Sequence, residues 1–312
     1  MSGGFAAADV PDLAGRCIYV TGADSGIGFE AVKVMAARGA RVILGCRDEA
    51  LAQTAIARVK AIVPRADLAF VAIDLADLDA IRRGAARLAD EPIDVLVNNA
   101  GLMVPPLLRT AQGHELHFGV NYLAGFTLAG LLLPQLAKRP DPRIVITSSF
   151  AHRRERMPWD EHGDDLDAHG HYNWWKRYGI SKLACLLFLL ELDRRLKATG
   201  SPVKAIGCHP GSSITGIIRH YPWPIPQIAP IARGLLNPPA RAAWPLLQAA
   251  TDPDVEAGGY YGPTGIGEVR GRSGAAKREP HALNRADAAR LWDWSVAATG
   301  VDPVPLAAPQ AA

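Results

Sequence analysis

Two kinds of apolar segment alternate along the chain. Short runs rich in Val, Ile and Leu are typical of buried strands, and longer stretches repeat apolar residues at helical spacing. This alternation predicts an α/β fold with one doubly wound parallel sheet and helices on both faces. The predicted strands are 16–21, 41–47, 68–75, 93–101, 143–149, 203–209 and 258–263. The predicted helices are 29–37, 48–63, one that begins near 77, 114–137, 178–190, 241–250 and 287–299.

Three segments lie outside this alternation. Residues 150–177 mix acids, histidines and arginines, and we expect them to form a solvated surface loop. Residues 262–277, which are rich in glycine and basic side chains, are also expected to be a loop. Residues 217–239 hold six prolines and few charges, which indicates an apolar substrate lid at about 214–240 or, alternatively, an oligomer contact.

The two chain ends lack the alternation as well. Residues 1–13 are expected to be a flexible N-terminus and residues 301–312 a disordered tail. Between them we find no internal repeat and no linker, so a single domain is predicted at 14–300.

A glycine-rich turn joins the first predicted strand to the first predicted helix. Glycines allow the backbone to turn tightly and to approach a pyrophosphate, whose charge a helix N-terminus stabilises. The strand–turn–helix context therefore predicts a nucleotide site. The expected contacts from this turn are Gly22, Ser25, Gly26, Ile27 and Gly28.

The end of the second predicted strand bears on the choice of cofactor. An acidic residue there would bond the 2′-hydroxyl of NAD, but this chain has Cys46 followed by Arg47. A guanidinium can pair with a 2′-phosphate, so the sequence favours NADP(H), with NAD(H) as an alternative. The competing interpretation is a solvated arginine at a strand end.

Further polar residues follow the third and fourth strands. Ligands of such sheets bind beyond the carboxyl ends of the strands. Asp74 could accept a hydrogen bond from an adenine amino group, or it could cap the helix that begins near Asp77. The expected cofactor contacts at these ends are Asp74, Leu75, Asn98, Ala100 and Gly101.

Candidate acid–base chemistry lies at the start of the helix at 178–190. Tyr178 and Lys182 are four residues apart and share one helical face. A nearby ammonium favours the phenolate, and a phenol of this kind can exchange a proton with a carbonyl or an alcohol. The same spacing also occurs on ordinary, partly exposed helix faces.

Two other polar positions interrupt apolar segments. Asn121 lies inside the long helix at 114–137, where an amide is unfavourable unless it is hydrogen-bonded, and a purely structural role is an open alternative. The fifth strand ends in Ser148 and Ser149, whose side chains should point in opposite directions.

Composition narrows the functional classes. The chain of 312 residues is 49% hydrophobic and carries a net charge of +3, which argues against a dedicated nucleic-acid binder. We expect no signal peptide, and the apolar stretches near 123–133 and 183–190 are too short to span a bilayer. Four cysteines without a Cys-x-x-Cys pair predict buried free thiols and a cytoplasmic location. Acids and histidines at 161–171 lack metal-ligand spacing, so no metal site is expected.

Taken together, these stretches resemble the short-chain dehydrogenase/reductase family, whose fold is of the Rossmann type. The similarity covers roughly residues 14–300. Its motifs are Thr21-Gly-x-x-x-Gly26-Ile-Gly28, Asn98-Asn99-Ala100-Gly101, Asn121, Ser149, Tyr178-x-x-x-Lys182 and Pro210-Gly211. Within the family the chain is most similar to the retinol-dehydrogenase-like and WW-domain-oxidoreductase-like group, through Gly45-Cys46-Arg47-Asp48 and Ser148-Ser149-Phe-Ala-His152.

The resemblance implies a role for each motif residue. Tyr178 would be the general acid or base, and Lys182 would lower its pKa and hold the nicotinamide ribose. Ser149, preferred to Ser148, would bond the substrate oxygen, and Asn121 would position a water. Pro210, Gly211 and Thr215 would hold the nicotinamide.

The function implied is an NADP(H)-dependent oxidoreductase of an apolar or aromatic carbonyl or alcohol. Its only expected ligand besides the cofactor is this small molecule, and oligomerisation is left open. The alternative is a non-catalytic redox sensor on the same fold.

Overall fold

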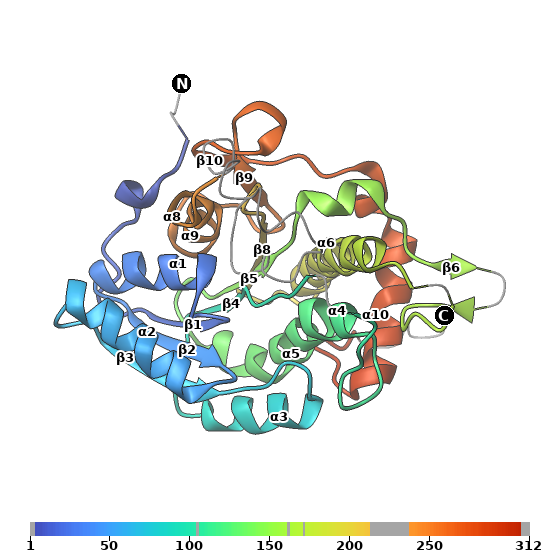
Figure 1. Cartoon of the computed structure of the whole chain (residues 1–312), viewed down its shortest axis with the longest axis horizontal. Coiled ribbons are helices and arrows are strands. Elements are labelled where there is room, and N and C mark those ends of the chain that lie inside the picture. The colour runs from blue at the N-terminus through green and yellow to red at the C-terminus, as the bar shows by residue number, and fades with distance from the viewer. Residues whose placement is uncertain (1–3, 104–105, 161–162, 171, 213–236, 307–312) are drawn as a thin grey trace.

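The computed structural model describes residues 4–103, 106–160, 163–170, 172–212 and 237–306 (Figure 1). Its centre is an eight-stranded sheet in the order β10-β9-β8-β5-β4-β1-β2-β3. Neighbouring strands are parallel throughout, except that β10 is antiparallel to β9. The strands are β1 (Cys17–Thr21), β2 (Arg41–Cys46), β3 (Leu68–Ala72), β4 (Val95–Asn98), β5 (Arg143–Thr147), β8 (Lys204–Cys208), β9 (Tyr260–Pro263) and β10 (Ser273–Ala275).

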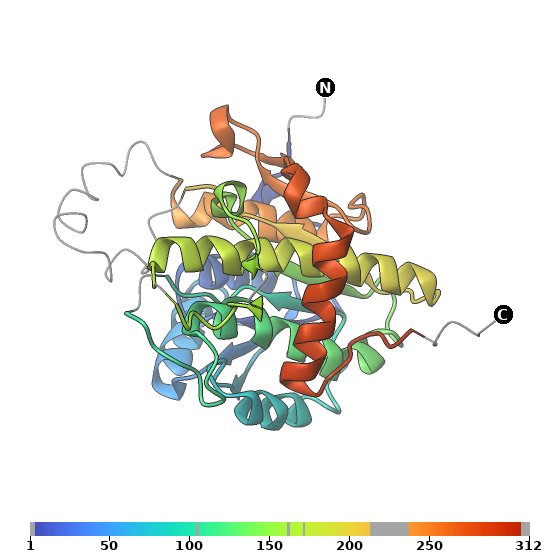
Figure 2. The same ribbon diagram turned by 90° about the vertical axis from the view of Figure 1, so that its right-hand side faces the viewer.

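Helices cover both faces of this sheet, which confirms the predicted α/β class (Figure 1). The α-helices are α1 (Gly26–Ala37), α2 (Glu49–Ile62), α3 (Leu78–Arg87), α4 (Leu116–Phe118), α5 (Ala124–Leu136), α6 (Trp174–Ala198), α8 (Pro239–Ala242), α9 (Trp244–Thr251) and α10 (Arg285–Thr299). Alternate residues of β1 divide between two cores, with Tyr19 facing α3, α5, α6 and α10 and Val20 facing α1, α2 and α9. Figure 2 shows α10 crossing the outer side of α6.

The N-terminal segment differs from the flexible one that we expected. Phe5 and Ser273 exchange two backbone hydrogen bonds, so residues near the start of the chain pair with the edge strand β10. The side chains of Phe5, Val10 and Leu13 are buried in the core on the α1 side. Apolar burial therefore orders residues 4–13. At the other end, Val304 is buried and Asp302 accepts a hydrogen bond from Trp292 Nε1, so residues 301–306 also differ from the expected disordered tail.

Two predicted loops contain regular structure. Within 262–277, β10 pairs with β9, and the turn between them holds the short helix η6 (Ile266–Glu268). Within 150–177, the chain forms η3 (Phe150–Arg154) and the small pair β6 (Trp159–Asp160) and β7 (Gly163–Asp164). The loop prediction was wrong here because these short elements are held by long-range contacts, such as that of Trp159 Nε1 with Asp287 at 2.9 Å.

The long apolar helix predicted at 114–137 is divided into three parts. Between α4 and α5 lies the π-helical segment η2 (Gly119–Leu123), which contains Asn121. Among the described residues, Leu116–Leu136 has the length and apolar composition of a membrane-crossing helix, but 67% of its most apolar window is buried inside the protein. This degree of burial is typical of a helix in the core of a protein.

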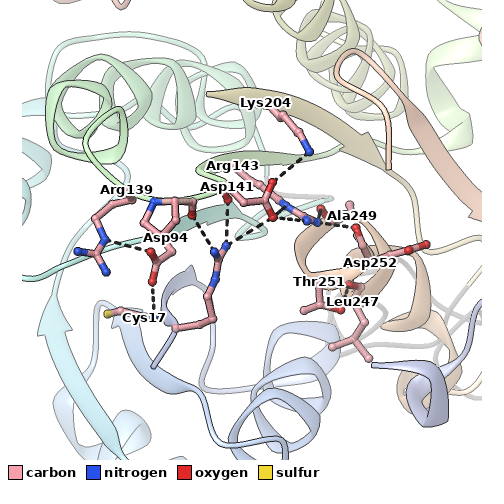
Figure 3. A network of polar contacts seen from close by, with 12 residues as sticks. Cys17, Asp94, Arg139, Asp141, Arg143, Lys204, Leu247, Ala249, Thr251 and Asp252 are labelled. Atoms are coloured by element: carbon pink, nitrogen blue, oxygen red, sulfur yellow. Dashed lines mark hydrogen bonds and ion pairs between the residues drawn. The ribbon is translucent and has the colours of Figure 1, made fainter. Parts of the chain in front are cut away.

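A network of polar contacts around two buried charged residues, Asp94 and Arg143, lies at the amino-terminal ends of the strands (Figure 3). Asp94 is fully buried and accepts hydrogen bonds from Cys17 N at 2.7 Å and from Arg139 Nε at 3.0 Å. Arg143 is 2% exposed and binds the Asp141 carboxylate and the Asp252 carbonyl oxygen. These contacts fix the sheet at the end opposite to the predicted ligand site, because Arg143 begins β5 and Ser148 follows its end.

Candidate active site

The glycine-rich turn follows the carboxyl end of β1. Gly22 and Gly26 have φ angles of +63° and +57°, which favour glycine. A Cβ at Gly28 would lie 2.4 Å from the Gly22 carbonyl oxygen and 2.6 Å from Asn99 Nδ2. Helix α1 begins at Gly26, earlier than predicted, with Ser25 at its N-cap position. The backbone amides of Gly26, Ile27 and Gly28 thus form the first turn, where an anion can bind.

Asn99 holds this turn in place. Its Nδ2 donates to the carbonyl oxygens of Thr21 and Gly22 at 2.9 and 3.2 Å. Thr21 Oγ1 in turn accepts from the backbone amides of Asn99 and Ala100 at 3.1 Å each. The neighbouring Asn98 Nδ2 instead donates to the Gly125 carbonyl oxygen on α5 at 3.2 Å. Sequence reasoning selected Asn98 and missed Asn99, although both amides stood in the same motif.

The residues expected around the adenosine lie at the ends of β2 and β3. Arg47 is exposed immediately after β2 and makes no ion pair within the part of the chain that the structure describes. Burial, with a contribution from Asp24, raises the pKa of the Cys46 thiol to about 12. Asp74 Oδ1 accepts from Ala76 N at 2.9 Å, and Asp77 itself caps α3. The capping role considered for Asp74 therefore belongs to Asp77.

The Tyr178–Lys182 pair lies on α6, which begins four residues earlier than Tyr178. Asn173 caps this helix by accepting from the amides of Trp175 and Lys176. Lys182 Nζ is 6.0 Å from the centre of the Tyr178 ring and donates to the Thr147 carbonyl oxygen at 3.0 Å. The lysine is 4% exposed, so its charge is held in the protein interior next to the end of β5.

Three of the predicted site residues meet at one point. A Cβ added to Gly101 would lie 3.3 Å from Lys182 Nζ and 3.2 Å from Asn121 Oδ1. The Asn121 amide is bonded on both sides, because Oδ1 accepts from Leu102 N at 2.8 Å and Nδ2 donates to Leu102 O at 3.0 Å. Nδ2 also contacts Ser181 Oγ at 3.0 Å. The amide thus ties the loop after β4 to α6, and its role toward a water stays a prediction.

The two serines after β5 have different partners. Ser148 is 1% exposed, and its Oγ donates to the Lys182 carbonyl oxygen at 2.7 Å. Ser149 caps η3, and its Oγ accepts from Ala151 N at 3.2 Å, which leaves the hydroxyl proton for another acceptor. The choice of Ser149 over Ser148 as the donor to a substrate oxygen stays a prediction.

The Pro210-Gly211 turn follows β8. Gly211 has a φ of +72°, and a Cβ there would lie 2.3 Å from the Val269 carbonyl oxygen. Asn237 fixes this turn with two hydrogen bonds. Its side-chain Nδ2 donates to Pro210 O at 3.1 Å, and its backbone N–H donates to Ser212 O at 2.7 Å. Thr215 and residues 214–236 of the predicted lid lie outside the described residues. The described remainder of that segment holds Asn237 and the start of α8.

Comparisons with known proteins agree with this geometry. A family model described as short chain dehydrogenase matches residues 16–160. Human retinol dehydrogenase 14 is 33% identical over 307 residues, which cover 92% of this chain and 87% of that protein. The chain belongs to the short-chain dehydrogenase family. Human retinol dehydrogenase 11 is 41% identical over 210 residues, covering 67% of this chain and 64% of that protein. These relatives place the chain in the retinol-dehydrogenase-like group of the family.

Solved structures extend the comparison to nearly the whole chain. An uncharacterised protein from Mycobacterium paratuberculosis is 34% identical with a TM-score of 0.80, covering 97% of this chain and all of that one. A short chain dehydrogenase from Shigella flexneri, solved with NADP, is 27% identical with a TM-score of 0.62 and covers 80% of this chain and 97% of that one. The protein is thus an NAD(P)-dependent dehydrogenase that acts on alcohol or carbonyl groups.

A buried acid–histidine pair beside the tyrosine of this dehydrogenase was missed from sequence. Glu115 and His117 are both fully buried, with Oε1 and Nδ1 2.8 Å apart. The His117 ring lies edge-on to Tyr178 at a centroid distance of 6.2 Å. Glu115 also caps α4 by accepting from the amides of His117 and Phe118. The signal in the sequence was the set of polar residues at the start of the predicted helix, in His114-Glu115-Leu116-His117.

Proposed function

We propose that this dehydrogenase uses NADP(H) to interconvert an apolar alcohol and its carbonyl, with Tyr178 as the acid and base. The observation that carries the proposal is the meeting of Lys182 Nζ, Gly101 and Asn121 one helical turn from Tyr178. Helix α1 packs closely against the turn because Gly28 lacks a side chain, and the glycines of the turn would let a pyrophosphate approach the backbone. Bound nicotinamide would supply or accept the hydride.

The protein's own residues would handle the proton and the developing charge. In carbonyl reduction, Tyr178 donates its phenolic proton to the substrate oxygen, and the Lys182 ammonium stabilises the phenolate that forms. Ser149 donates a hydrogen bond to the same oxygen as negative charge develops on it. In alcohol oxidation the proton moves in the reverse direction.

Replacement of the tyrosine tests this assignment. We expect Tyr178→Phe to lower kcat by about 100-fold or more, because general acid catalysis contributes factors of this size. The dissociation constant for NADPH, measured by fluorescence titration, should change less than threefold. Tyr261→Phe, at a half-buried tyrosine on β9, is the matched control and should keep its activity. Substantial turnover by the Tyr178 variant would contradict the acid–base role.

Arg47 is the residue from which we propose a preference for NADP(H) over NAD(H). β2 ends in Cys46, where an NAD-binding strand would carry an acid, and this exposed guanidinium follows directly. A related structure was solved with NADP. A charge-assisted bond to a 2′-phosphate is worth about 1.5–3 kcal/mol, so Arg47→Ala should lower the NADPH-over-NADH ratio of kcat/KM at least about tenfold. Arg87→Ala, at an exposed arginine on α3, should leave that ratio unchanged. An equal kcat/KM for both cofactors in the unaltered protein would refute the preference.

The substrate class rests on two observations. Residues 217–239 are rich in proline, aromatic and aliphatic side chains, and the relatives are retinol dehydrogenases. A screen of NADPH oxidation over aldehydes, ketones and quinones, with retinaldehyde among the apolar ones, would test it. Tight NADPH binding without turnover across this panel and the reverse alcohol panel would favour the redox-sensor alternative. A cytoplasmic location stays a prediction, which cell fractionation would test.

A further inference from the structure

The turn between β9 and β10 lies directly against the Pro210-Gly211 turn. Ser212 N donates to the Val269 carbonyl oxygen at 3.0 Å, and a Cβ at Gly211 would lie 3.0 Å from the Glu268 carbonyl oxygen. Gly267 and Glu268 have φ angles of +64° and +57°. A glutamate rarely adopts this conformation, so its surroundings must hold it there.

The Glu268 side chain bridges two strand ends. Its Oε2 lies 2.5 Å from Arg153 Nη2 and 3.0 Å from His209 Nε2, and its Oε1 accepts from Lys277 N at 2.9 Å. Arg153 belongs to η3, which begins directly after Ser149. His209 comes directly after β8, immediately before Pro210. One carboxylate thus joins the serine turn to the predicted nicotinamide turn.

The direction of each hydrogen bond in this bridge follows from the geometry. Gly211 N donates to His209 Nδ1 at 3.3 Å, so the imidazole proton is on Nε2 and is donated to Glu268. Burial lowers the pKa of His209 and keeps the ring neutral. Burial alone would raise the pKa of Glu268, but the bonds from His209 and Lys277 N and the charge of Arg153 outweigh it and hold that pKa below its ordinary value. The bridge is therefore an ionised carboxylate with fixed donors.

The bridge also requires space that only glycine leaves. A Cβ at Gly262 would lie 2.0 Å from His209 Nε2, so the imidazole fills the position that a side chain on β9 would take. His209 is fully buried, and Glu268 keeps 19% of its side-chain surface exposed. The bridge is thus packed into the sheet end rather than lying on the surface.

We propose that Glu268 is a positioning residue that locks the Pro210-Gly211 turn to the Ser149 turn and so sets the distance between the nicotinamide and the substrate oxygen. Ser149 would bond that oxygen, and Gly211 would face the nicotinamide. This inference rests on the proposed function. Misplacement of reacting groups by about 1 Å can cost roughly 100-fold in rate, so a link between the two turns affects catalysis without touching the substrate.

The test compares Glu268→Gln with Glu279→Gln. The amide has the same size but one acceptor oxygen, so it cannot serve Arg153, His209 and Lys277 N together. Glu279, which lies 3.6 Å from Lys277 Nζ near the same turn, is the matched control. We expect Glu268→Gln to lower kcat roughly 10- to 100-fold per NADPH-binding site, with KM and the NADPH dissociation constant changed less than threefold.

A double variant separates positioning from general destabilisation. If Glu268 acts through Arg153, Glu268→Gln combined with Arg153→Met should lose no more kcat than the worse single variant. The proposal would be overturned if the double variant lost kcat by the product of the two single losses. It would also be overturned if the kcat per site of Glu268→Gln stayed within threefold of that of the unaltered protein. Should Glu268→Gln fail to fold, Arg153→Met alone removes the same link and carries the same expectation.

Fluorescence of bound NADPH provides a readout that does not need turnover. A nicotinamide held rigidly between the two turns should emit more strongly than free NADPH, and Glu268→Gln should lose most of this enhancement while NADPH still binds. The unaltered protein could enhance NADPH fluorescence, and Glu268→Gln could lose that enhancement, while the unaltered protein shows no turnover. This result would refute the proposed function but support the bridge. Turnover with unchanged enhancement in the variant would refute the bridge alone.

Discussion

His152 should make the protein acid-sensitive. The residue is fully buried in η3, and its Nδ1 lies 2.6 Å from the Ser149 carbonyl oxygen. Its Nε2 has no hydrogen-bond partner among the described residues. Burial lowers the pKa of His152 from 6.5 to about 4, with the bond to Ser149 opposing and Arg153, His209 and His281 adding to the decrease. The ring is therefore neutral in the folded protein at pH 7.

The magnitude follows from the difference between the folded and unfolded pKa values. In the unfolded chain the histidine takes up a proton at its ordinary pKa of 6.5, whereas in the fold it does so only near 4. The stabilisation is thus fully present above pH 6.5 and is lost as the pH falls from 6.5 to 4. At 1.36 kcal/mol for each pKa unit, the full loss is about 3 kcal/mol, of which about 2 kcal/mol falls between pH 7 and pH 5.

Urea unfolding at pH 7 and pH 5 measures this loss. His152→Asn keeps a donor near the position of Nδ1 but does not titrate, so its free energy of unfolding should fall about 2 kcal/mol less between these pH values than that of the unaltered protein. His169→Asn, at an exposed histidine, should behave like the unaltered protein. Parallel pH dependences for the His152 variant and the unaltered protein would refute the reasoning.

Two further perturbations follow from close contacts. A Cβ at Gly28 would lie 2.4 Å from Gly22 O, so Gly28→Ala should cost about 1–3 kcal/mol in the turn and weaken NADPH binding about tenfold or more in a fluorescence titration. Gly170→Ala is its control. An NADPH affinity of Gly28→Ala equal to that of the unaltered protein would contradict the role of the glycine turn in cofactor binding. Asp94→Asn leaves a buried amide donor against Cys17 N or Arg139, so urea unfolding should show a loss of about 2–3 kcal/mol with kcat per site unchanged. A loss no larger than that of the exposed Asp90→Asn would count against this account.

Local patterns in the sequence determined most of the fold. The strands from β1 to β5 and β8 lie where short apolar runs predicted them. Inner strands such as β1, β5 and β8 are covered on both faces and need apolar residues at most positions, whereas the edge strand β3 is half-buried. The turn after β1 was readable for a similar reason, since only glycine tolerates the φ angles and the close approach found there. Tyr178 and Lys182 share one face of α6 because their spacing alone requires it.

Other features were decided only by contacts between distant residues. The pairing of Phe5 with Ser273 and the strand β10 join segments whose own sequences carry weak strand signals. The difference between Ser148 and Ser149 depends on α6, because the Lys182 carbonyl oxygen on that helix accepts the hydrogen bond from the Ser148 hydroxyl. Asn99 was distinguished from Asn98 in the same way, by the carbonyl oxygens of the glycine turn.

The Glu268 bridge is the clearest case of this second kind. In the sequence it is a lone acid among glycines and basic residues, with no periodicity to mark it. In the fold it meets Arg153 and His209, which are more than fifty residues away along the chain, at the end of the sheet. The periodicity of a sequence shows which face of its own helix or strand a residue occupies. A hydrogen bond across the site depends instead on how three elements pack against one another, which only the tertiary structure determines.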